Sequence, residues 1–495
     1  MRGDVFGAPK TREEIYNELV KIVGASDVSD NDIDKFCYVR SGATEVDRRV
    51  FGRMGPGVPP MFIVWPESTE EVVDLVKLAN DEEIPIIPYG GGRGGHGGIL
   101  PVRDRSVIID MRKMDKILEL SWEGTVARVQ AGIYPEVLDN ELRKHGFFFP
   151  HDPQSFWSSN IGGMISTSAA GRLASKYGYM GDFVLGLEVV LPNGKVLRTR
   201  PVMKSSAGPD LNWLFVGAGG TLGIVTEAWL KFYPLPEVYP PRTHAVQFKD
   251  FHSAWQAASK IARKSNCKGY PSMFRLSDEN HVKRIMGGLI GLPEEEREGA
   301  LLFVGFDGDE AMVDLQERLA LETCRKEGGK DLGTEMGMNY WNTRYTGYHG
   351  KYEVPREVVE RDPGWMKGRG STIVAATTFD RVEPLHAEIL NVFEKYGVWN
   401  AILLTHITPK GAALYSIFRV VDDDYDRGTK LWRQVWDEGV EVCHKYDGTF
   451  EHHHEIGSIS GMYMDAELEY GMEIWRMLKK ELDPKNIMNP GKAGL

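Results

Sequence analysis

Cysteine is scarce in this chain, with four residues among 495, and no two of them form a C-x-x-C pair. A zinc ribbon or a dithiol redox motif needs such close pairs, so the sequence argues against both. Isolated cysteines are most often buried and reduced, and we therefore expect four buried thiols in a cytoplasmic protein. These are Cys37, Cys267, Cys324 and Cys443.

Long apolar runs and an excess of positive charge are also missing. No apolar run approaches the roughly 18 residues of a membrane-spanning helix. The first residues, MRGDVFGAPKTREEIYNEL, lack the pattern of a signal peptide. The formal net charge is −12, and lysine and arginine form no block along the chain. Nucleic acids are bound by clustered positive charge, so we expect neither a nucleic-acid partner nor a transmembrane segment.

The composition is that of a folded protein, with 42% hydrophobic and 26% charged residues. At 495 residues the chain exceeds one ordinary core, which predicts two domains. Residues 68–81 predict a helix that begins with a capping box of Ser68 and Glu71. Residues 185–199 predict a hairpin closed by a type I′ turn at Asn193–Gly194. Residues 466–482 predict one helix, followed by an extended tail.

A glycine-rich stretch, IIPYGGGRGGHGGIL, occupies residues 86–100, and seven of the nine residues from Gly90 to Gly98 are glycine. A flexible linker would be rich in serine and would not lie between apolar segments. Gly90, Gly92 and Gly95 fit G-x-G-x-x-G, but no helical pattern follows them, so a Rossmann fold is excluded. Bare backbone amides can approach an anion closely. The loop therefore predicts a dinucleotide diphosphate held without a Rossmann helix.

Several ordered motifs resemble the FAD-binding domain of the vanillyl-alcohol oxidase / p-cresol methylhydroxylase (PCMH) superfamily. They are FIVWPESTEEVVDLVKLANDEEIPIIPYGGGRGGHGG, HDPQSFWSSNIGGMISTSAAG, GLEVVLPNGKVLRT, LFVGAGGTLGIVTEAWLKFYP and the ending LDPKNIMNPGKAGL. The resemblance implies an α+β fold with a PCMH-type two-subdomain FAD-binding domain, a substrate (cap) domain built on an antiparallel sheet, and a C-terminal tail that returns to the FAD domain. The expected ranges are an N-terminal helical segment (1–55), the FAD-binding domain (56–238), the substrate domain (239–450) and a C-terminal segment (451–495).

The same resemblance implies which residues hold FAD. Pro88 to Gly94 would cradle the FAD pyrophosphate, and Gln154 to Asn160 and Thr167 to Ala170 would line the midsection of the cofactor. Gly219 to Val225 would hold the remaining flank with main-chain groups. Small side chains would let a flat ring system lie close to the backbone. The implied cofactor-binding residues are Pro88, Tyr89, Gly90, Gly91, Gly92, Arg93, Gly94, His96, Gln154, Ser155, Ser158, Ser159, Asn160, Gly163, Thr167, Ser168, Ala169, Gly219, Gly220, Thr221, Leu222, Gly223, Ile224, Val225, Asn489 and Lys492.

Within the superfamily, the segments SMFRLSD, THITPKGAALYSIF and EHHHEIG resemble the alkyldihydroxyacetonephosphate synthases. D-lactate and glycolate dehydrogenases share the domain plan and the NPGK ending, but the histidine string of their metal site is absent here. The resemblance places Arg275 at a phosphate-binding arginine and Tyr415 at a catalytic acid/base tyrosine, and it matches His452, His453 and His454 to a histidine triplet. The implied catalytic residues are Tyr415, His453, His454, His406 and Arg275.

The histidines leave alternatives open. In an extended segment His452 and His454 would share one face and His453 the other, and such a group can accept a proton, bind an anion or bind a metal. We predict no metal site, because carboxylate and cysteine partners at ligand spacing are not evident. His96 either contacts the substrate, bonds covalently to the flavin or packs within the loop. His406 faces the flavin or lies in a core.

The favoured function is an FAD-dependent oxidoreductase that removes a hydride from an alcohol, a 2-hydroxy acid or a para-substituted phenol. One alternative is the non-redox reaction of ether-lipid synthesis, and another is a flavin-binding subunit of an electron-transfer complex. Glu455 stands where the synthases have glycine, and the loop carries Arg93 and His96 in place of small hydroxylic residues, so the first function is preferred. Expected partners are a small-molecule substrate, an electron-acceptor protein or oxygen, and a second copy in a homodimer.

Overall fold

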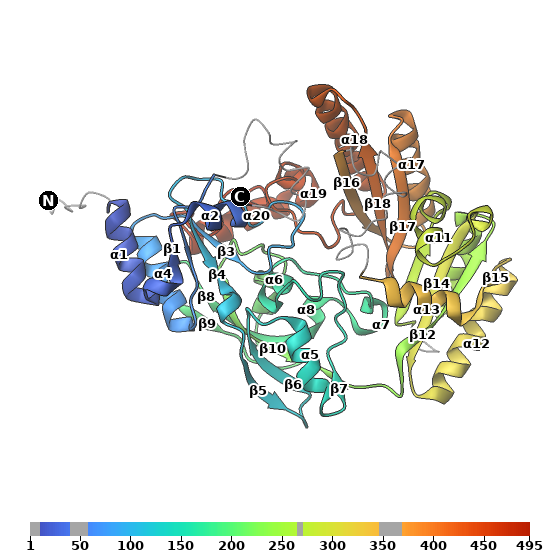
Figure 1. The fold of residues 1–495 in the computed structure, drawn as a ribbon, viewed down its shortest axis with the longest axis horizontal. Coiled ribbons are helices and arrows are strands. Elements are labelled where there is room, and N and C mark those ends of the chain that lie inside the picture. The colour runs from blue at the N-terminus through green and yellow to red at the C-terminus, as the bar shows by residue number, and fades with distance from the viewer. Residues whose placement is uncertain (1–9, 40–57, 265–270, 346–368) are drawn as a thin grey trace.

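A computed structural model describes residues 10–39, 58–264, 271–345 and 369–495 (Figure 1). In Figure 1 two sheets of the N-terminal half lie to the left, and a larger sheet lies to the right. The C-terminal segment comes back from the larger sheet to the N-terminal half. Residues 1–9 and 40–55 of the expected N-terminal helical segment lie outside the described residues. The described part of that segment contains α1 (Arg12–Val23), β1 (Val28–Ser29) and α2 (Asp32–Tyr38).

The first sheet has the strand order β1-β2-β4-β3, and β2, β4 and β3 run parallel. The predicted helix at 68–81 is observed as α4 (Thr69–Asp81), which connects β2 to β3 and buries Val72, Leu75, Val76 and Ala79. Ser68 Oγ caps it by accepting from Glu71 N–H at 3.2 Å. Glu71 itself accepts from Glu67 N–H, so the predicted capping box is only half formed. The strands are β2 (Phe62–Val64), β3 (Ile86–Tyr89) and β4 (Val107–Asp110).

The second sheet is antiparallel, with the strand order β5-β6-β10-β8-β9. The predicted hairpin is present between β8 and β9, but its turn is not type I′, because Gly194 has a φ of 75° and Asn193 does not have a positive φ. Pro192 holds φ negative at the first central position, which favours a type I turn followed by glycine. The strands are β5 (Ile117–Ser121), β6 (Val126–Gln130), β8 (Val184–Val190), β9 (Val196–Arg198) and β10 (Ile224–Lys231).

The short helices of this half lie around the second sheet. Asn160 caps α6 by accepting from Gly163 N–H at 2.9 Å. The buried side chains of this region form one core with the sheet. The helices are α5 (Pro135–Arg143), α6 (Ile161–Ser166), α7 (Ala174–Tyr177) and α8 (Met180–Phe183), and β7 (Phe147–Phe148) pairs with β11 (Tyr233–Pro234).

The third sheet has seven antiparallel strands in the order β15-β12-β14-β13-β17-β18-β16. Four helices cover one of its faces and bury residues such as Trp255, Phe393 and Trp432 in a single core. The strands are β12 (Val238–Phe248), β13 (Met273–Ser277), β14 (Ala300–Gly308), β15 (Lys330–Asp331), β16 (Arg369–Thr377), β17 (Trp399–Thr408) and β18 (Gly411–Val420), and the four helices are α9 (Phe251–Lys264), α12 (Glu310–Lys326), α17 (Val382–Lys395) and α18 (Tyr425–Lys445).

Strand alternation decides which side chains of this sheet face away from the four helices. On β13, Phe274 and Leu276 enter the core, so Arg275 points to the opposite face. On β18, Leu414 enters the core and Tyr415 points to the opposite face. The predicted catalytic residues therefore lie on the side of the sheet that is free of the four helices. On this side, α13 (Gly333–Thr343) and α7 also contact the sheet.

The C-terminal segment differs from the prediction in one element. Residues 466–482 form two helices, α19 (Met464–Leu468) and α20 (Tyr470–Leu482), because Glu469 adopts a left-handed φ of 49° that ends the first. The tail returns to the first sheet as predicted. Ile86 N–H donates to Ile487 O at 2.8 Å, and Asn489 N–H donates to Ile86 O at 2.8 Å.

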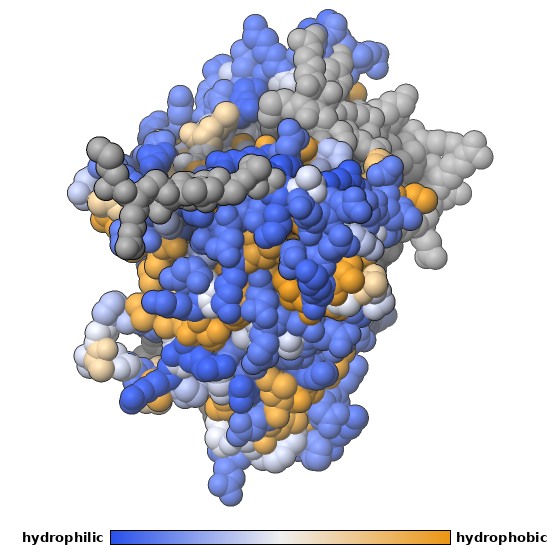
Figure 2. Space-filling model, turned by 90° about the vertical axis from the view of Figure 1, so that its left-hand side faces the viewer, coloured by the Kyte–Doolittle hydropathy of each residue, from blue (hydrophilic) through white to orange (hydrophobic). Residues whose placement is uncertain are grey.

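The cysteine prediction is only partly right. Cys324 and Cys443 are buried, but Cys37 is exposed, because it lies on the outer side of the short helix α2. Cys267 lies outside the described residues. Among the described helices, none combines the length and the apolarity needed to cross a membrane. The face that carries α1 and α4 is largely hydrophilic, with apolar patches separated by polar side chains (Figure 2).

Candidate active site

The first half of the glycine loop packs against the segments expected to hold the cofactor. A Cβ on Gly90 would collide with the side-chain amide of Asn160, and one on Gly91 would collide with the backbone oxygen of Ser158. Gly92 has a φ of 65° and packs on the hydroxyl of Tyr89. At Gly91 two backbone segments approach each other more closely than any side chain allows, and at Gly90 and Gly92 the nearby polar side chains leave no room for a Cβ.

The second half of the loop packs against a different partner, the carboxylate of Glu455. A Cβ on Gly94 or Gly98 would collide with that carboxylate, which accepts from Gly98 N–H at 3.2 Å. Burial raises the pKa of Glu455 to about 7, while hydrogen bonds from the backbone of Gly98 and His96 and the charge of Lys492 act in the opposite direction. The second half of the loop thus packs against a carboxyl group of the protein itself, and the contact of the first half with a bound diphosphate stays a prediction.

Two further segments complete the cradle. Gly217 N–H donates to Ile165 O at 3.0 Å and Gly219 N–H to Ser166 O at 2.8 Å, which joins the second glycine-rich segment to the end of α6. Asn489 Nδ2 donates to Gly98 O at 3.0 Å and to Gly219 O at 2.7 Å. The C-terminal tail thus ties the two glycine-rich segments together.

Two polar atoms of this cradle indicate a ligand. Asn160 Nδ2 and Asn489 Oδ1 are buried and have no hydrogen-bond partner among the described residues. The other amide atom of each side chain is fixed by the backbone, so neither side chain is free to turn. Buried polar atoms are normally satisfied, and a cofactor with donors and acceptors in this cradle would satisfy both. The residues present therefore fit FAD.

The predicted cofactor residues differ in exposure. Leu222, Ile224 and Val225 belong to the hydrophobic cores, so only their backbone can face a ligand. Arg93 and Gln154 are exposed; Pro88, Gly90, Gly91, Gly92, Gly94, Ser155, Ser158, Ser159, Gly163, Thr167, Ser168, Ala169 and Gly219 are partly buried; Tyr89, His96, Asn160, Gly220, Thr221, Leu222, Gly223, Ile224, Val225, Asn489 and Lys492 are buried.

The predicted catalytic residues come together on the open side of the third sheet. The ring of His453 lies 5.0 Å from that of His406 and 6.0 Å from that of Tyr415, measured between ring centroids. The ring of His454 lies 5.1 Å from that of Tyr415. His406 faces this cluster and does not lie in the core, since a bulge in β17 between Leu404 and His406 shifts the alternation.

The histidine triplet does not alternate as the sequence predicted. His452 and His453 both turn toward His406 and share a contact of 3.0 Å between their Nδ1 atoms, while His454 points away toward His96. The segment is bent and not extended, because Glu451 Oε1 accepts from His454 N–H at 2.9 Å and from His453 N–H at 3.4 Å. The backbone of the triplet therefore bends around the Glu451 carboxylate.

Burial keeps these imidazoles neutral. Desolvation lowers the pKa of His453 and His406 well below the ordinary value, and neighbouring histidines and Arg275 add to the effect. Desolvation also lowers the pKa of His452 to about 4. Neutral imidazoles can accept a proton, so the cluster can act as a general base.

A pair of arginines borders the histidines. Arg275 Nη1 donates to Tyr340 Oη at 2.7 Å, and the charge of Arg172 also acts on this phenol. Burial opposes ionisation of Tyr340, but the two guanidinium groups outweigh it and lower the pKa of the phenol. The Nε atoms of Arg275 and Arg172 have no hydrogen-bond partner among the described residues. The pair is suited to an anionic group of a substrate.

Several residues of the site were missed in the sequence. Tyr179 lies beside the histidines and contacts His452 Nε2 through its hydroxyl at 3.2 Å. Arg172 follows a run of small residues, and Tyr340 lies on α13, with no local pattern that marks either. Glu451 directly precedes the triplet, which was the one available signal.

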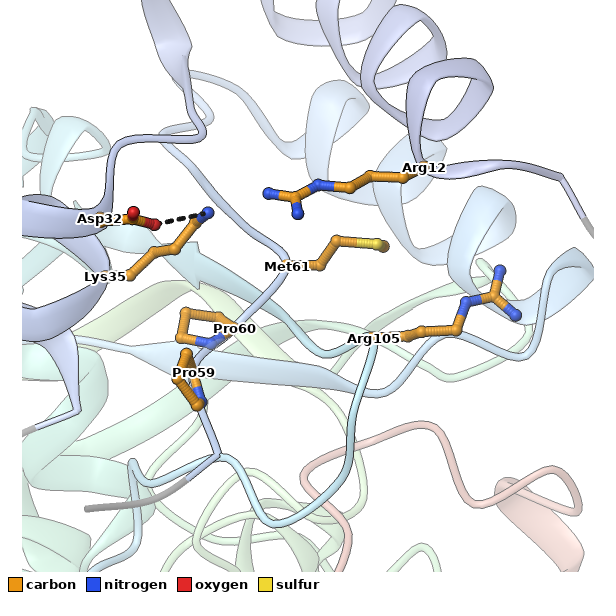
Figure 3. A pocket seen from close by; sticks show the side chains of 7 residues that line it. All are labelled: Arg12, Asp32, Lys35, Pro59, Pro60, Met61 and Arg105. Carbon is orange, nitrogen blue, oxygen red and sulfur yellow. Dashed lines mark ion pairs between the residues drawn. The ribbon is translucent and has the colours of Figure 1, made fainter. Parts of the chain in front are cut away.

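A pocket of about 520 Å³ lies elsewhere, beside α1 and α2 (Figure 3). Its cations already have partners in the chain. Lys35 Nζ pairs with Asp30 at 2.6 Å and with Asp32 at 3.6 Å, and Arg12 pairs with Asp30. We assign no function to it. Its lining residues are Arg12, Asp32, Lys35, Pro59, Pro60, Met61 and Arg105.

Comparisons with known proteins agree with this geometry. Residues 60–200 match the FAD binding domain family, and residues 241–493 match the C-terminal domain of FAD linked oxidases. The chain is 29% identical to an alkyldihydroxyacetonephosphate synthase of Trypanosoma brucei brucei, covering 88% of this chain and 73% of the relative. It is 26% identical to glycolate oxidase subunit GlcD of Bacillus subtilis, covering 97% and 96%. It is 30% identical to a mitochondrial D-lactate dehydrogenase [cytochrome] of Arabidopsis thaliana, covering 88% and 73%.

Solved structures give the same fold. An alkyldihydroxyacetonephosphate synthase superimposes with a TM-score of 0.77 at 25% identity, covering 98% of this chain and 87% of that chain. A p-cresol methylhydroxylase with substrate bound superimposes with a TM-score of 0.73 at 19% identity, covering 98% and 96%. The fold is thus the predicted PCMH type. The match to the C-terminal domain alone spans more than half of the chain, and the chain therefore belongs to the FAD-linked oxidases, with FAD as its cofactor.

Proposed function

We propose that this chain is an FAD-dependent oxidoreductase that oxidises a small hydroxylated substrate, and that a 2-hydroxy acid fits its site best. The observation that carries the proposal is the cluster of neutral histidines, His406, His452 and His453, beside two buried arginines. Imidazoles that remain neutral can take a hydroxyl proton, and guanidinium groups can hold a carboxylate.

The anionic end of the substrate binds first to Arg275 and Arg172. Their unpartnered Nε atoms supply donors that no described residue uses. Tyr340 accepts from Arg275 Nη1 at 2.7 Å, and Arg172 donates to the backbone oxygens of Asp152 and Arg344. A carboxylate held there would bring the neighbouring hydroxyl carbon toward the histidines, since Arg275 lies on the same face of the third sheet as Tyr415, whose ring is 6.0 Å from that of His453.

His453 then accepts the hydroxyl proton. It is central in the cluster, since its ring contacts those of His406, Tyr415 and His454. Bound FAD would supply the acceptor for the hydride that leaves the same carbon, so the alcohol becomes a carbonyl. Tyr415 orients the imidazole and relays the proton. A substrate carboxylate also neutralises Arg275, whose charge disfavours the imidazolium, so binding of the substrate makes His453 more basic.

The names of two relatives, a D-lactate dehydrogenase and a glycolate oxidase subunit, support a 2-hydroxy acid. Arg93 and His96 of the glycine loop, and Glu455 after the histidine triplet, depart from the synthase pattern, which supports an oxidoreductase over the ether-lipid reaction. Oxygen or an electron-transfer protein as acceptor, and a homodimer, belong to the same proposal. Reoxidation of the reduced protein by each acceptor and the mass in solution test them.

A second function has support in the comparisons. The synthase of Trypanosoma brucei brucei is similar over 88% of this chain, and the arginine pair could equally take a phosphate group. In that case the enzyme would exchange an acyl group for a fatty alcohol without net oxidation.

Anaerobic mixing separates the two functions. The purified flavoprotein is mixed with D-lactate, L-lactate, glycolate, 4-ethylphenol and 1-propanol, and the flavin absorbance is followed. We expect bleaching by a 2-hydroxy acid and none by 1-propanol, which lacks the carboxylate. If no compound bleaches the flavin and acyl-dihydroxyacetone phosphate reacts with a fatty alcohol, the synthase function replaces the oxidoreductase function.

A further inference from the structure

A second cluster of ligand-type side chains lies behind the histidines of the active site. It consists of His96 from the glycine loop and of Glu451 and His454 from the segment that follows α18. One nitrogen of each imidazole and one carboxylate oxygen lie within 4.8 Å of one another. His96 precedes the other two by more than 350 residues, so local spacing in the sequence gives no sign of this cluster.

The distances between the carboxylate and the imidazoles suit a shared cation. His96 Nδ1 lies 3.5 Å from Glu451 Oε2, and His454 Nδ1 lies 3.9 Å from Glu451 Oε1. Ligand atoms at about 2.1 Å from a metal ion are separated by at most roughly 4.2 Å. Both separations are already below this limit. The imidazole nitrogens of His96 and His454 lie within 4.8 Å of each other, and His454 is the less buried of the two rings.

Glu451 has one oxygen with no partner. Its side chain is 2% exposed. Oε1 is held by the two backbone N–H groups of the triplet, and Oε2 has no hydrogen-bond partner among the described residues. A buried carboxylate oxygen without a partner is strongly unfavourable, and such an atom points to an ion or water that completes its contacts.

We propose that His96, Glu451 and His454 form a binding site for a first-row divalent metal ion, with Zn²⁺ or Fe²⁺ as the best-fitting ions. Two imidazoles and one carboxylate are the donors that such ions prefer, whereas Mg²⁺ and Ca²⁺ prefer oxygen donors alone.

This site is separate from the other group of three histidines. His406, His452 and His453 also lie within 4.8 Å of one another, and the two groups share no residue. They are adjacent, because the ring of His454 lies 6.0 Å from that of His96 and 4.5 Å from that of His453. The proposed ion would connect the glycine loop to the C-terminal segment. Three protein ligands would leave at least one position for water.

Metal titration of the intact flavoprotein tests the proposal. The protein is treated with EDTA, passed into metal-free buffer and titrated separately with Zn²⁺, Co²⁺ and Mg²⁺, and bound metal is measured after gel filtration. We expect one Zn²⁺ per chain, a visible Co²⁺ spectrum perturbed by imidazole ligands, and no stoichiometric Mg²⁺. Absence of stoichiometric Zn²⁺ and Co²⁺ binding would overturn the proposal.

Variants locate the ion. Glu451→Gln and His96→Asn should each weaken Zn²⁺ binding at least about 100-fold, since even loss of an outer-sphere partner costs up to about that factor. His452→Asn is the matched control from the other cluster, and its affinity should stay within about threefold. If His452→Asn abolishes binding and His96→Asn does not, the ion lies in the other cluster and the proposal is wrong. Flavin content and circular dichroism report folding, and if Glu451→Gln does not fold, His96→Asn decides.

Discussion

The packing of Gly98 against Glu455 predicts the effect of one added methyl group. In Gly98→Ala the new Cβ would lie 2.7 Å from Glu455 Cδ and 2.8 Å from Oε1, and closer still to Oε2. Carbon atoms do not approach this closely, so the carboxylate must move. In the parent chain Glu455 Oε1 accepts a hydrogen bond from Gly98 N–H at 3.2 Å. The displaced carboxylate would lose this hydrogen bond.

The cost can be bounded from these contacts. Overpacking of a well-filled site costs about 1–3 kcal/mol. If the cofactor needs the undistorted loop, this strain weakens FAD binding by roughly 5- to 150-fold. Loss of the hydrogen bonds to a buried carboxylate acts in the same direction. We therefore expect the FAD affinity of Gly98→Ala to be roughly 5- to 150-fold weaker than that of the parent chain.

Two controls are available in the same chain. Gly95 is in the same loop, and a Cβ there would meet nothing within 4 Å. Gly95→Ala makes the same chemical change and should leave FAD affinity within about threefold, as ordinary surface substitutions do. In a Glu455→Ala background the obstacle is gone, and adding Gly98→Ala should then have little further effect.

The assay is FAD release from the purified flavoprotein, followed by flavin fluorescence during dilution and reconstitution, for the four variants and the parent. Equal affinities in Gly98→Ala and Gly95→Ala would refute the reasoning. So would an undiminished effect of Gly98→Ala in the Glu455→Ala background, because the methyl group would then act on something other than the carboxylate.

Further predictions concern chemistry, substrate binding and pH. Tyr415→Phe should lower kcat by about 10²- to 10⁴-fold with FAD still bound, measured by steady-state turnover and the flavin spectrum; unchanged turnover removes Tyr415 from acid/base work. Arg275→Lys should raise KM for a 2-hydroxy acid by at least tenfold with a smaller effect on kcat, since lysine lacks the bidentate fork. Because burial raises the pKa of Glu455 from 4.5 to about 7, the folded state holds this proton more tightly than the unfolded chain does. The free energy of unfolding should fall by up to about 3 kcal/mol as the pH rises from about 4.5 to about 7. Thermal melting at a series of pH values measures this fall, which should be absent in Glu455→Gln.

The fold could be predicted wherever local pattern decides the structure. The spacing of four apolar residues predicts the buried face of α4, and Ser68 predicts its N-cap. The return of the tail was predicted from family resemblance, and the backbone pairing of Ile86 with residues 487–489 explains it. The break at Glu469 could not be predicted, because a left-handed glutamate carries no sequence signal.

The candidate site could be predicted only residue by residue. Tyr415, His453 and Arg275 could be predicted, because each lies in a segment that resembles the alkyldihydroxyacetonephosphate synthases. The partners Arg172 and Tyr340 come from distant segments, and their pairing depends on how α13 packs against the third sheet. The orientation of the triplet was predicted wrongly, since strand alternation does not apply where Glu451 captures two backbone N–H groups.

The glycine loop connects the two halves of the chemistry. Its first half packs on the Ser158–Asn160 segment of the cofactor cradle, and its second half packs on Glu455 and Ser458 of the C-terminal segment. The same segment carries the histidine triplet, which occupies the three residues directly before Glu455. We therefore expect a movement of Glu455 to shift the predicted cofactor cradle and the proposed proton acceptor together. This arrangement explains why so many glycines are needed: except at Gly95, a Cβ on any glycine of the loop would collide with backbone or with a polar side chain.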